Sequence, residues 1–591
     1  MKVLAFDIEA DGLLNEATTI HCGVVYDYDT GETETYRDPD LLYQRLLQAD
    51  RLVAHNGRMY DCPVLVRLVG RPRGYPDLGP CLDTALMSRL LWPNHDSPSG
   101  GHDLDSWGTY LGLTKKHTDI DDWSVYTPEM MERCESDVQI QKALYDFILP
   151  RLSGLGPCIQ IEHTVASIVC KQIENGFHVN TDVLDDLERD LQIERAAAMD
   201  DLSQIEPWVE EVELKTPAYW FIEKPDLTEK YRIKSDAPPN IRPHLERGPN
   251  KKKQVVTVFN PGSRQHICRL FKEKYNWKHT KETEKGNPIM DEAVLRTLDY
   301  PEAKTLARVF LIDKRLSQTA QWRKYLKDDG RIHGSVITNG AVSGRMTHSK
   351  PNMAQIPKVG KPWGEECRSV FGPRKGWVLV GADASGLELR MLAHYMSKWD
   401  NGEYAKVVLE GDIHTVNQEA AGLPTRDNAK TFIYGFIYGA GDAKVGQIVG
   451  SGRKRGRELK EQFLDGLPAL RELIKSVKGK TELVGLDGRK YPVRSEHMAL
   501  NTLLQGAGAV VMKQALIEFW NLAHDQIGPH GERWALCANV HDEVQMECEP
   551  ELADKLGGLF IEGLKRAGEY FSLGIKIDGE YKVGKNWAST H

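Results

Sequence analysis

The sequence predicts an α/β protein built from several domains. Its 591 residues exceed what one hydrophobic core organises and suit about three or four domains. Hydrophobic residues make up 41% and charged residues 27% of the chain, which is typical of a globular protein rather than a disordered one. Short apolar runs of strand type alternate with segments of helical periodicity, and several of these runs end at an acid.

Composition also argues against several classes of protein. No run approaches the roughly 18 uninterrupted apolar residues of a membrane span, and Asp7 comes too early for a signal peptide, so we expect a cytoplasmic protein without membrane contact. The ten cysteines show no Cys-x-x-Cys pair and no zinc spacing, so free thiols and no structural zinc are expected. The net charge of -9 argues weakly against nucleic acid, although a basic groove beside acidic metal sites gives the same sum.

The N-terminal segment presents two acids on one strand. Residues 3–9 form a short, mostly apolar run, and Asp7 and Glu9 fall on one face because side chains alternate along a strand. Two neighbouring carboxylates repel each other unless a cation lies between them. We therefore expect a divalent metal ion at this strand.

Two further acids follow in order. A second short strand at residues 51–54 leads into the turn HNGRMYD, which ends at Asp61. Residues 129–146 have helical periodicity and contain Asp137. Each acid alone is better explained as a helix cap or an exposed charge. The ordered set of four is more specific than any one of them.

This ordered set resembles the DEDD 3′-to-5′ exonucleases, whose RNase H-like fold is a mixed sheet flanked by helices. The resemblance implies that Asp7, Glu9, Asp61 and Asp137 are catalytic. It also implies two Mg²⁺ ions, held by Asp7, Glu9 and Asp137, that activate water and stabilise the departing 3′-oxygen.

The chain departs from the exonuclease pattern at one position. Proofreading members have a Tyr four residues before the last acid or a His five residues before it, whereas this chain has Arg133 and Glu132 there. The residue that would orient the attacking water is therefore missing. One hypothesis is that Arg133 binds the scissile phosphate instead.

Residues 152–326 are predicted to form long helices without a catalytic cluster. Periodicity indicates helices at residues 161–173 and 184–202, and another after residue 263. Residues 205–258 differ, because prolines, aromatic residues and a lysine run interrupt any helical pattern. Two interpretations of this insertion stay open: a surface excursion and a docking platform for a partner.

The stretch from residue 377 to 396 joins a strand to a helix through one acid. An apolar run at 377–380 precedes Asp383, and a helical pattern follows from Leu389. A carboxylate at the carboxyl end of a buried strand reaches ligands in the crevice there, and it suits a hard metal ion. The competing interpretation is that Asp383 caps the helix and that Ser385 and Glu388 form a capping box.

Residues 424–439 carry a stripe of two cations and two aromatic rings. Arg426, Lys430, Tyr434 and Tyr438 recur every four residues, which on a helix drifts by only about 40° per step. The amino end of a helix attracts anions, so the cations suit a polyphosphate and the tyrosines suit a base and sugar. An amphipathic helix with a structural role explains the tyrosines but not two cations on their face.

A hairpin near the C-terminus supplies a second acid. Strand-like runs at residues 534–540 and 544–548 are joined through His541, Asp542 and Glu543. Acidic turns are common on surfaces. Asp383 nevertheless needs a partner, because two metals about 3.5–4 Å apart require carboxylates from two strands.

Together these segments resemble the family A DNA polymerases, whose fold is a right hand of palm, fingers and thumb. The resemblance is carried by DASGLELR at 383–390, TRDNAKTFIYG at 425–435, GLDGRK at 485–490 and the ending NWASTH at 586–591. Within the family it narrows to the replicative polymerases of T7-like bacteriophages. It implies an exonuclease domain at 1–150, a thumb at 151–330 with the insertion at 205–258, a first part of the palm at 331–410, fingers at 411–484, and a second part of the palm with the tail at 485–591.

The resemblance also implies a role for each site residue. Asp383 and Asp542, with the backbone carbonyl of Ala384, would hold two Mg²⁺ ions for nucleotidyl transfer, and Glu543 would support them. The nucleotide contacts would be His414, Arg426, Lys430, Tyr434, Tyr438 and Glu388. The last of these would help to exclude a 2′-hydroxyl. The contacts with the primer–template minor groove, where acceptors are common to all base pairs, would be Arg345, Gln505 and His541.

Primer–template DNA and dNTPs are the substrates that the resemblance implies. A phage primase-helicase and a single-strand-binding protein are the implied replication partners, in the cytoplasm of an infected bacterium. Host thioredoxin, or another processivity factor, is the candidate partner of residues 205–258. No 5′-nuclease segment precedes Asp7, so that activity is not expected.

Two alternative functions remain open from the residues. One is a DEDD nuclease whose C-terminal half binds nucleic acid without synthesis, and the other is a non-enzymatic scaffold. Neither alternative requires Asp383, Asp542 and the cationic helix together, and this sequence contains all three.

Overall fold

The chain contains both strands and helices, as the sequence predicts, but they also come in runs, such as the five described strands from residue 208 to 257 and the seven helices from residue 387 to 477. The computed structural model describes residues 1–591 except 94–95, 118–119, 215–217, 224–227, 232–243, 248–250, 280–281, 285 and 591. The described residues form two units, residues 1–184 with 321–591 and residues 185–320. None of the helices in this part of the chain has both the length and the apolar character of a membrane span.

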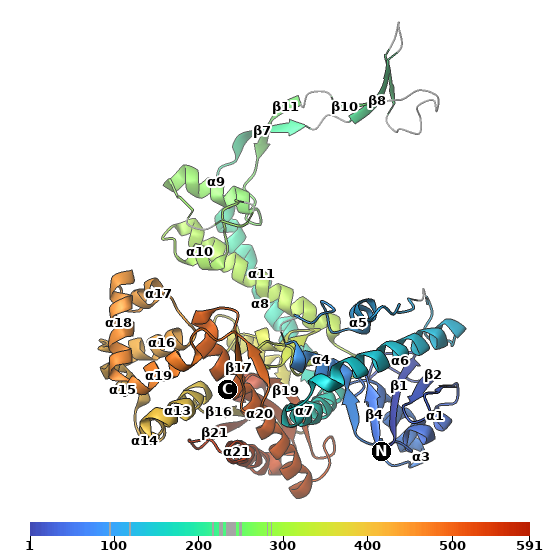
Figure 1. Ribbon diagram of the computed structural model, residues 1–591. Helices are drawn as coiled ribbons and strands as arrows, with labels where there is room; N and C mark the ends of the chain where they lie inside the picture. The colour runs from blue at the N-terminus through green and yellow to red at the C-terminus, as the bar shows by residue number, and fades with distance from the viewer. Residues whose placement is uncertain are drawn as a thin grey trace. The chain divides into compact units, whose positions relative to one another are not determined.

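The N-terminal sheet has five strands in the order β3-β2-β1-β4-β5, and Figure 1 labels β1, β2 and β4. Its central strand, β1 (Val3–Ala10), is antiparallel to β2 (Ile20–Asp27) and parallel to β4 (Arg51–Ala54). The edges are β3 (Thr33–Tyr36) and β5 (Cys81–Asp83). A mixed sheet with this order is the RNase H-like arrangement that the sequence predicts.

Alternation along β1 assigns its side chains to two helical layers. Leu4, Phe6 and Ile8 pack with α1 (Pro39–Leu46), α2 (Asp61–Leu65) and η1 (Val66–Gly70). Ala5 packs on the other face with α4 (Thr84–Leu91), α5 (Leu104–Leu111) and α6 (Pro128–Ile148). Asp7 and Glu9 share the face of Ala5, so they lie toward α6, which carries Asp137.

Helix α7 (Gly156–Asn175) follows the first sheet and is hydrogen-bonded to it. His163 Nε2 accepts the main-chain N–H of Asp83 at 2.7 Å, and the His163 Nδ1–H donates to the carbonyl of Ile159 at 2.7 Å. Arg58, on the loop before Asp61, donates to the Ser167 hydroxyl at 2.9 Å. These bonds join the N-terminal sheet to the helix that leads into the rest of the chain.

The second unit is mainly helical. Its core is formed by α8 (Thr181–Ser203), α9 (Arg264–Tyr275), α10 (Glu292–Arg296) and α11 (Pro301–Tyr325). The described backbone of the proline-rich insertion is extended, in β7 (Trp208–Leu214), β8 (Ala218–Glu223), β9 (Thr228–Tyr231), β10 (His244–Arg247) and β11 (Lys251–Thr257). Strands β7 and β11 pair with each other, and β8 pairs with β9 and β10.

A second sheet, antiparallel throughout, has the order β19-β20-β16-β21. Its strands are β16 (Val378–Ala384), β19 (Trp534–Val540), β20 (Glu543–Cys548) and β21 (Gly579–Gly584). This sheet shares a hydrophobic core with α13 (Leu387–Asp400), α20 (Ala499–Gln526) and α21 (Ala553–Tyr570). Short strand pairs flank it, including β13 (Ser335–Ile337) with β14 (Thr347–Ser349) and β17 (Glu482–Val484) with β18 (Lys490–Pro492).

Helix α13 begins without a side-chain cap. Gly386 is its N-cap residue, in the left-handed region at φ 58°, and no side chain accepts the first helical N–H groups. The interpretation of Asp383 as a cap, with Ser385 and Glu388 in a capping box, is therefore wrong. Glycine tolerates this backbone conformation without strain, which leaves both carboxylates available for other contacts.

Six helices lie between residues 403 and 477: α14 (Glu403–Glu410), α15 (Ile413–Ala421), α16 (Arg426–Ile437), α17 (Asp442–Ile448), α18 (Arg453–Gly466) and α19 (Pro468–Val477). The Thr425 side chain caps α16 by accepting the N–H of Asn428 at 3.1 Å. Residues Ala429, Phe432, Ile433 and Ile437 form the buried face of α16. The predicted stripe of two cations and two tyrosines is thus on the less buried face.

Candidate active sites

Asp383 and Asp542 come from two neighbouring strands and meet where β16 ends. Asp383 is the second-last residue of β16, and Asp542 directly precedes β20. The main-chain N–H of Ala384 donates to the carbonyl oxygen of Asp542 at 3.1 Å. His541 adopts a left-handed conformation, φ 60°, in the turn that brings Asp542 to this position. The strand pairing therefore fixes both acids on rigid backbone.

The electrostatics of this pair favour a cation. Burial, together with the nearby carboxylates of Asp542 and Glu543, raises the pKa of Asp383 to about 7. Burial also raises the pKa of Asp542, with Glu388 adding to the effect. Within the described residues, neither Asp383 nor Asp542 forms an ion pair with a Lys or Arg side chain, but Lys358 lies near enough to lower the pKa of both acids, and Arg345 lowers that of Asp542. Two neighbouring half-buried carboxylates whose pKa values stay raised despite these cations fit a hard divalent ion such as Mg²⁺.

Glu543 has a different environment from the two aspartates. Its carboxylate accepts hydrogen bonds from Arg368 Nη1 at 3.2 and 3.3 Å, from Gln545 Nε2 at 2.8 Å and from the Trp587 indole. The Arg368 guanidinium also lies over the Trp587 ring, 4.5 Å from its centroid. Three buried donors hold Glu543, so it is arranged as a support of the sheet. The sequence did not indicate Arg368 as part of this site.

Glu388 connects a loop to the end of the cationic helix. Its Oε1 accepts from Arg345 Nη2 at 3.2 Å and from the Tyr438 hydroxyl at 3.3 Å. Burial raises the pKa of Tyr434, and Glu388 and Asp542 raise it further, which places this ring near both acids. The structure thus brings Arg345, Glu388, Tyr438 and Tyr434 together beside Asp542.

The cations of α16 gather with His414. Arg426 Nε contacts Asp412 Oδ2 at 2.7 Å, and Asp412 caps α15 by accepting the N–H of His414 at 3.1 Å. Burial lowers the pKa of His414, and the charges of Arg426 and Lys430 lower it further. Lys430 is exposed. Arg426, in contact with Asp412, and Lys430 are therefore both exposed near the amino end of α16, where cations suit phosphate groups.

The predicted DNA contacts are only partly brought together. Arg345 and His541 line one crevice with Met512 and Asn539. Gln505, which is half-buried on α20, precedes Met512 by two turns and does not line this crevice.

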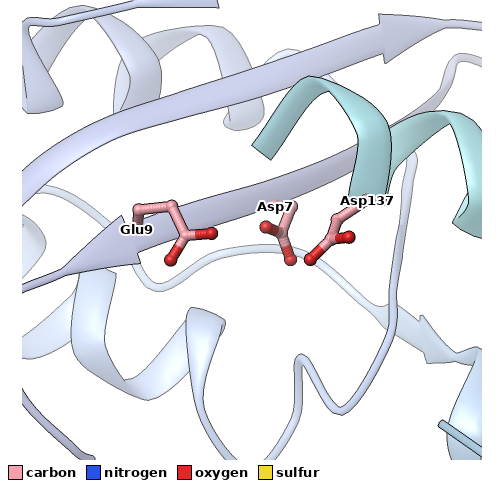
Figure 2. A group of neighbouring side chains, drawn as sticks. All are labelled: Asp7, Glu9 and Asp137. Carbon is pink, nitrogen blue, oxygen red and sulfur yellow. The ribbon is translucent and has the colours of Figure 1, made fainter. Parts of the chain in front are cut away.

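Three of the four exonuclease acids form one cluster. Figure 2 shows Asp7 and Glu9 on the strand and Asp137 on the facing helix. Their ligand oxygens all lie within 4.8 Å of one another. Asp61 is buried beside them, and its Oδ1 accepts the main-chain N–H of Ile8 at 3.3 Å. Carboxylate oxygens in this arrangement match the preference of Mg²⁺ for hard ligands.

Burial shifts the protonation of these acids. It raises the pKa of Asp7 well above its usual range, that of Glu9 to about 7 and that of Asp61 to about 8. For Asp7 the neighbouring acids add to the shift, Asp61 most of all. A divalent ion would relieve this repulsion, and it would lower these pKa values by favouring the charged carboxylates.

Two cations contact the acid cluster. Lys115 Nζ lies 2.6 Å from Asp137 Oδ2, and Arg133 Nε lies 3.0 Å from Glu9 Oε1. Arg133 thus occupies, beside Glu9, the position where the resemblance leads one to expect Tyr. Lys115 was missed from the sequence because it lies in a loop between α5 and α6, where no periodicity or motif singles it out.

A cavity of about 500 Å³ adjoins the loop that leads to Asp61. His55, Asn56 and Met59 line it on the side of this loop, and residues 336–338 line it as well. Both segments belong to the same unit of the structure. The cavity therefore lies between the exonuclease-like sheet and the segment that precedes β14.

Comparison with known proteins agrees with this geometry. Residues 240–589 match the model of DNA polymerase family A, and residues 4–126 match that of the RNase H superfamily. The DNA-directed DNA polymerase of Escherichia phage T7 is 37% identical to this chain, and that of Enterobacteria phage T3 is 36% identical. Both alignments cover 100% of this chain and 100% of the relative.

More distant relatives share part of the chain or its fold. The thermostable DNA polymerase I of Thermus aquaticus is 28% identical over 56% of this chain and 42% of its own length. The polymerase domain of Pol1 from M. smegmatis, solved with DNA primer-template and dNTP, has a TM-score of 0.76 at 18% identity. That match covers 100% of this chain and 96% of the other, and it shows a common fold. With a family model matching more than half of its residues and two phage relatives aligned end to end, the chain belongs to DNA polymerase family A.

Proposed function

We propose that this protein is a DNA-directed DNA polymerase that replicates a phage genome, with a linked 3′-to-5′ exonuclease for proofreading. The observation that carries the proposal is the junction of Asp383 and Asp542, held by the hydrogen bond from Ala384. Two half-buried acids, one at the end of β16 and one just before β20, suit transfer of a nucleotide from a triphosphate to a primer when a helix with cations at its amino end supplies the triphosphate contacts.

Asp383 and Asp542, with the backbone carbonyl of Ala384, would hold two Mg²⁺ ions. When bound, these ions supply activation of the attacking oxygen and neutralise charge on the leaving oxygen, here and in the exonuclease site. Glu543 supports the strand from within its network of donors. The unpaired carboxylates and the raised pKa of Asp383 support this assignment.

The substrate contacts follow the charges around these acids. Arg426, Lys430 and His414 bind the triphosphate at the amino end of α16. Tyr434 and Tyr438 lie under the base and sugar, and Glu388 restricts the space for a 2′-hydroxyl. In the primer–template minor groove, Arg345 and His541 contact the DNA from their common crevice and Gln505 contacts it from α20.

The excision site uses the acids of the first sheet. Asp7, Glu9 and Asp137 would hold two Mg²⁺ ions, and Asp61 completes the catalytic set. The buried Asp137 Oδ1 accepts no hydrogen bond in the described structure, which leaves one ligand atom open for a metal. The adjoining cavity is large enough for the terminal nucleotide of a primer.

The subdomain boundaries remain predictions: exonuclease at 1–150, thumb at 151–330, palm at 331–410 and 485–591, and fingers at 411–484. Host thioredoxin or another processivity factor is the proposed partner of residues 205–258. A primase-helicase and a single-strand-binding protein are the proposed partners in the cytoplasm of the infected host. A pull-down from host lysate, with and without residues 206–257, tests the first of these. Equal processivity of the chain with and without residues 206–257 would contradict the proposal that a processivity factor binds there.

Primer extension by Asp383→Asn tests synthesis. The amide keeps the shape of the carboxylate but removes the charge that a divalent ion needs, so extension should be abolished. Glu580→Gln is the matched control, because Glu580 lies on β21 opposite Asp383 of β16 in the strand register but is exposed. Activity that survives in Asp383→Asn would overturn the assignment. It would favour a nuclease whose C-terminal half only binds nucleic acid.

A further inference from the structure

The two acid sites of this chain differ in their contacts with cations. In the exonuclease cluster, Lys115 contacts Asp137 at 2.6 Å and Arg133 contacts Glu9 at 3.0 Å. In the polymerase site, no Lys or Arg of the described residues forms such an ion pair with Asp383 or Asp542, but Lys358 lies near enough to lower the pKa of both acids and Arg345 that of Asp542. The acids of both sites are otherwise buried or half-buried, and the pKa values of Asp7, Glu9, Asp383 and Asp542 are raised.

The pair of Lys115 and Asp137 is unlike an ordinary surface pair. The Lys115 side chain is 16% exposed and that of Asp137 is 6% exposed. The next residue, Lys116, pairs with Glu132 at the same distance, 2.6 Å, but these side chains are 56% and 55% exposed. Charges interact more strongly where water is excluded, so the buried pair influences its site far more than the exposed pair does.

Both cations contact carboxylates that a metal would use. Asp137 and Glu9 belong to the cluster whose ligand atoms lie within 4.8 Å of one another, and each has one oxygen in contact with a cation. A divalent ion that enters must displace these cations or share the carboxylates with them. In either case the positive charge of Lys115 and Arg133 opposes binding of the ion.

We propose that Lys115 and Arg133 set the metal affinity of the exonuclease site, holding it below the affinity that its acids alone would give. Excision then requires a higher divalent-ion concentration than the same acids would need without these two cations. This inference rests on the proposed exonuclease function of the cluster. It assigns to both residues a positioning role that acts through Asp137 and Glu9.

Direct binding of Mn²⁺, followed by electron paramagnetic resonance, tests this proposal without an activity assay. The full chain carries Asp383→Asn and Asp542→Asn, so that the remaining tight sites are those of the exonuclease. In this background, Lys115→Met should lower the Kd for Mn²⁺ about tenfold, because one unit charge a few ångströms from the ion is removed. Lys115→Arg keeps the charge and should bind Mn²⁺ as the parent does.

Lys116→Met is the matched control, and its Kd should equal that of the parent. Arg133→Gln is an independent variant that should also tighten Mn²⁺ binding, and it decides the matter if Lys115→Met fails to fold. Unchanged or weaker binding in the charge-removing variant that folds would overturn the proposal.

The same titration separates this inference from the proposed exonuclease function. Asp137→Asn should abolish the Mn²⁺ signal of the background chain. If the background chain binds no Mn²⁺, or if Asp137→Asn binds it equally well, the exonuclease metal site itself is refuted and the inference falls with it. If Mn²⁺ binds and depends on Asp137 but not on Lys115 or Arg133, only the inference is refuted.

Discussion

The indole N–H of Trp587 donates a hydrogen bond to the carboxylate of Glu543, so the last described turn of the chain is tied to the strand that follows Asp542. Thr590, three residues later, donates to Gln545 Oε1 on the same strand at 2.9 Å. Both Trp587 and Glu543 are buried. The C-terminal residues are therefore part of the support for the polymerase acids.

Replacing Trp587 by Phe tests this support. The change keeps an aromatic ring but leaves the buried Glu543 carboxylate one donor short, which should lower the free energy of unfolding by about 1–3 kcal/mol. The rate of primer extension should fall with little change in the KM for dNTP. Urea unfolding and steady-state kinetics measure both effects. The half-buried Trp399→Phe serves as control, and equal behaviour of the two variants would contradict the prediction.

Glu388→Ala should relax sugar discrimination. The variant removes the carboxylate that holds Arg345 and Tyr438, and it opens space beside the sugar of the incoming nucleotide. We expect the ratio of kcat/KM for rNTP over dNTP to rise by about tenfold or more. Single-nucleotide insertion kinetics measure the ratio. Glu403→Ala, an exposed acid at the start of α14, is the control; an unaltered ratio in Glu388→Ala would remove the proposed role.

Lys430→Gln should weaken triphosphate binding. Lys430 is an exposed cation on the open face of α16, and a charge-assisted contact with phosphate contributes about 1.5–3 kcal/mol. The KM for dNTP should therefore rise by at least about tenfold, whereas affinity for primer–template should stay constant. Titrations of dNTP and DNA separate the two. Lys406→Gln, on α14, should behave as the parent, and a matching KM in Lys430→Gln would argue against the assignment.

Arg133→Tyr should change single-strand digestion. Tyr at this position would resemble the proofreading relatives and would remove the cation from Glu9, so we expect faster digestion, by about tenfold or more. Release of terminal nucleotides from a single-stranded oligonucleotide measures the rate. Arg151→Tyr, at an exposed arginine after α6, is the control. Identical rates in the parent and Arg133→Tyr would show that this position does not matter.

His163 should make the fold sensitive to acid. Burial lowers its pKa to about 4, and its Nε2 must stay unprotonated to accept the N–H of Asp83. Below pH 6.5 the unfolded chain takes up a proton that the folded chain excludes, so stability is full at pH 7 and falls as the pH drops. From pH 7 to pH 4.5 this contributes a loss of about 2–3 kcal/mol.

Chemical denaturation at both pH values checks this loss. His163→Gln keeps an acceptor but does not titrate. Its free energy of unfolding relative to that of the parent should therefore rise by about 2–3 kcal/mol between pH 7 and pH 4.5. The exposed His117→Gln should show no such change. A constant difference between His163→Gln and the parent would contradict the expected role.

Much of the fold was predictable because it depends on local periodicity. Alternation placed Asp7 and Glu9 on one face of β1, and the four-residue spacing placed the cations and tyrosines on the open face of α16. The strand at Arg51–Ala54 was predicted with the same bounds as observed. These elements follow rules that operate within a few residues. A single sequence, without an alignment of relatives, is therefore enough to predict them.

The contacts that were missed depend on tertiary structure. Lys115 lies in a loop, and Arg368 reaches Glu543 across 175 positions of sequence. The expected cap at Asp383 was wrong because a glycine in the left-handed region begins the helix instead. The sequence gives the type of residue at such positions. It does not show which distant side chain will donate a hydrogen bond to a buried carboxylate.

The hydrogen bonds between α7 and the first sheet limit how this enzyme can be redesigned. Truncation at residue 150 would strip His163 and Ser167 of their partners and expose a helix face that evolved in contact with protein. An exonuclease-free version for DNA synthesis is better made by point substitution at Asp7 or Glu9, which leaves the scaffold whole. The proofreading and polymerase sites thus depend on one shared fold. Deleting the N-terminal domain would destabilise the part of the chain that carries the polymerase site.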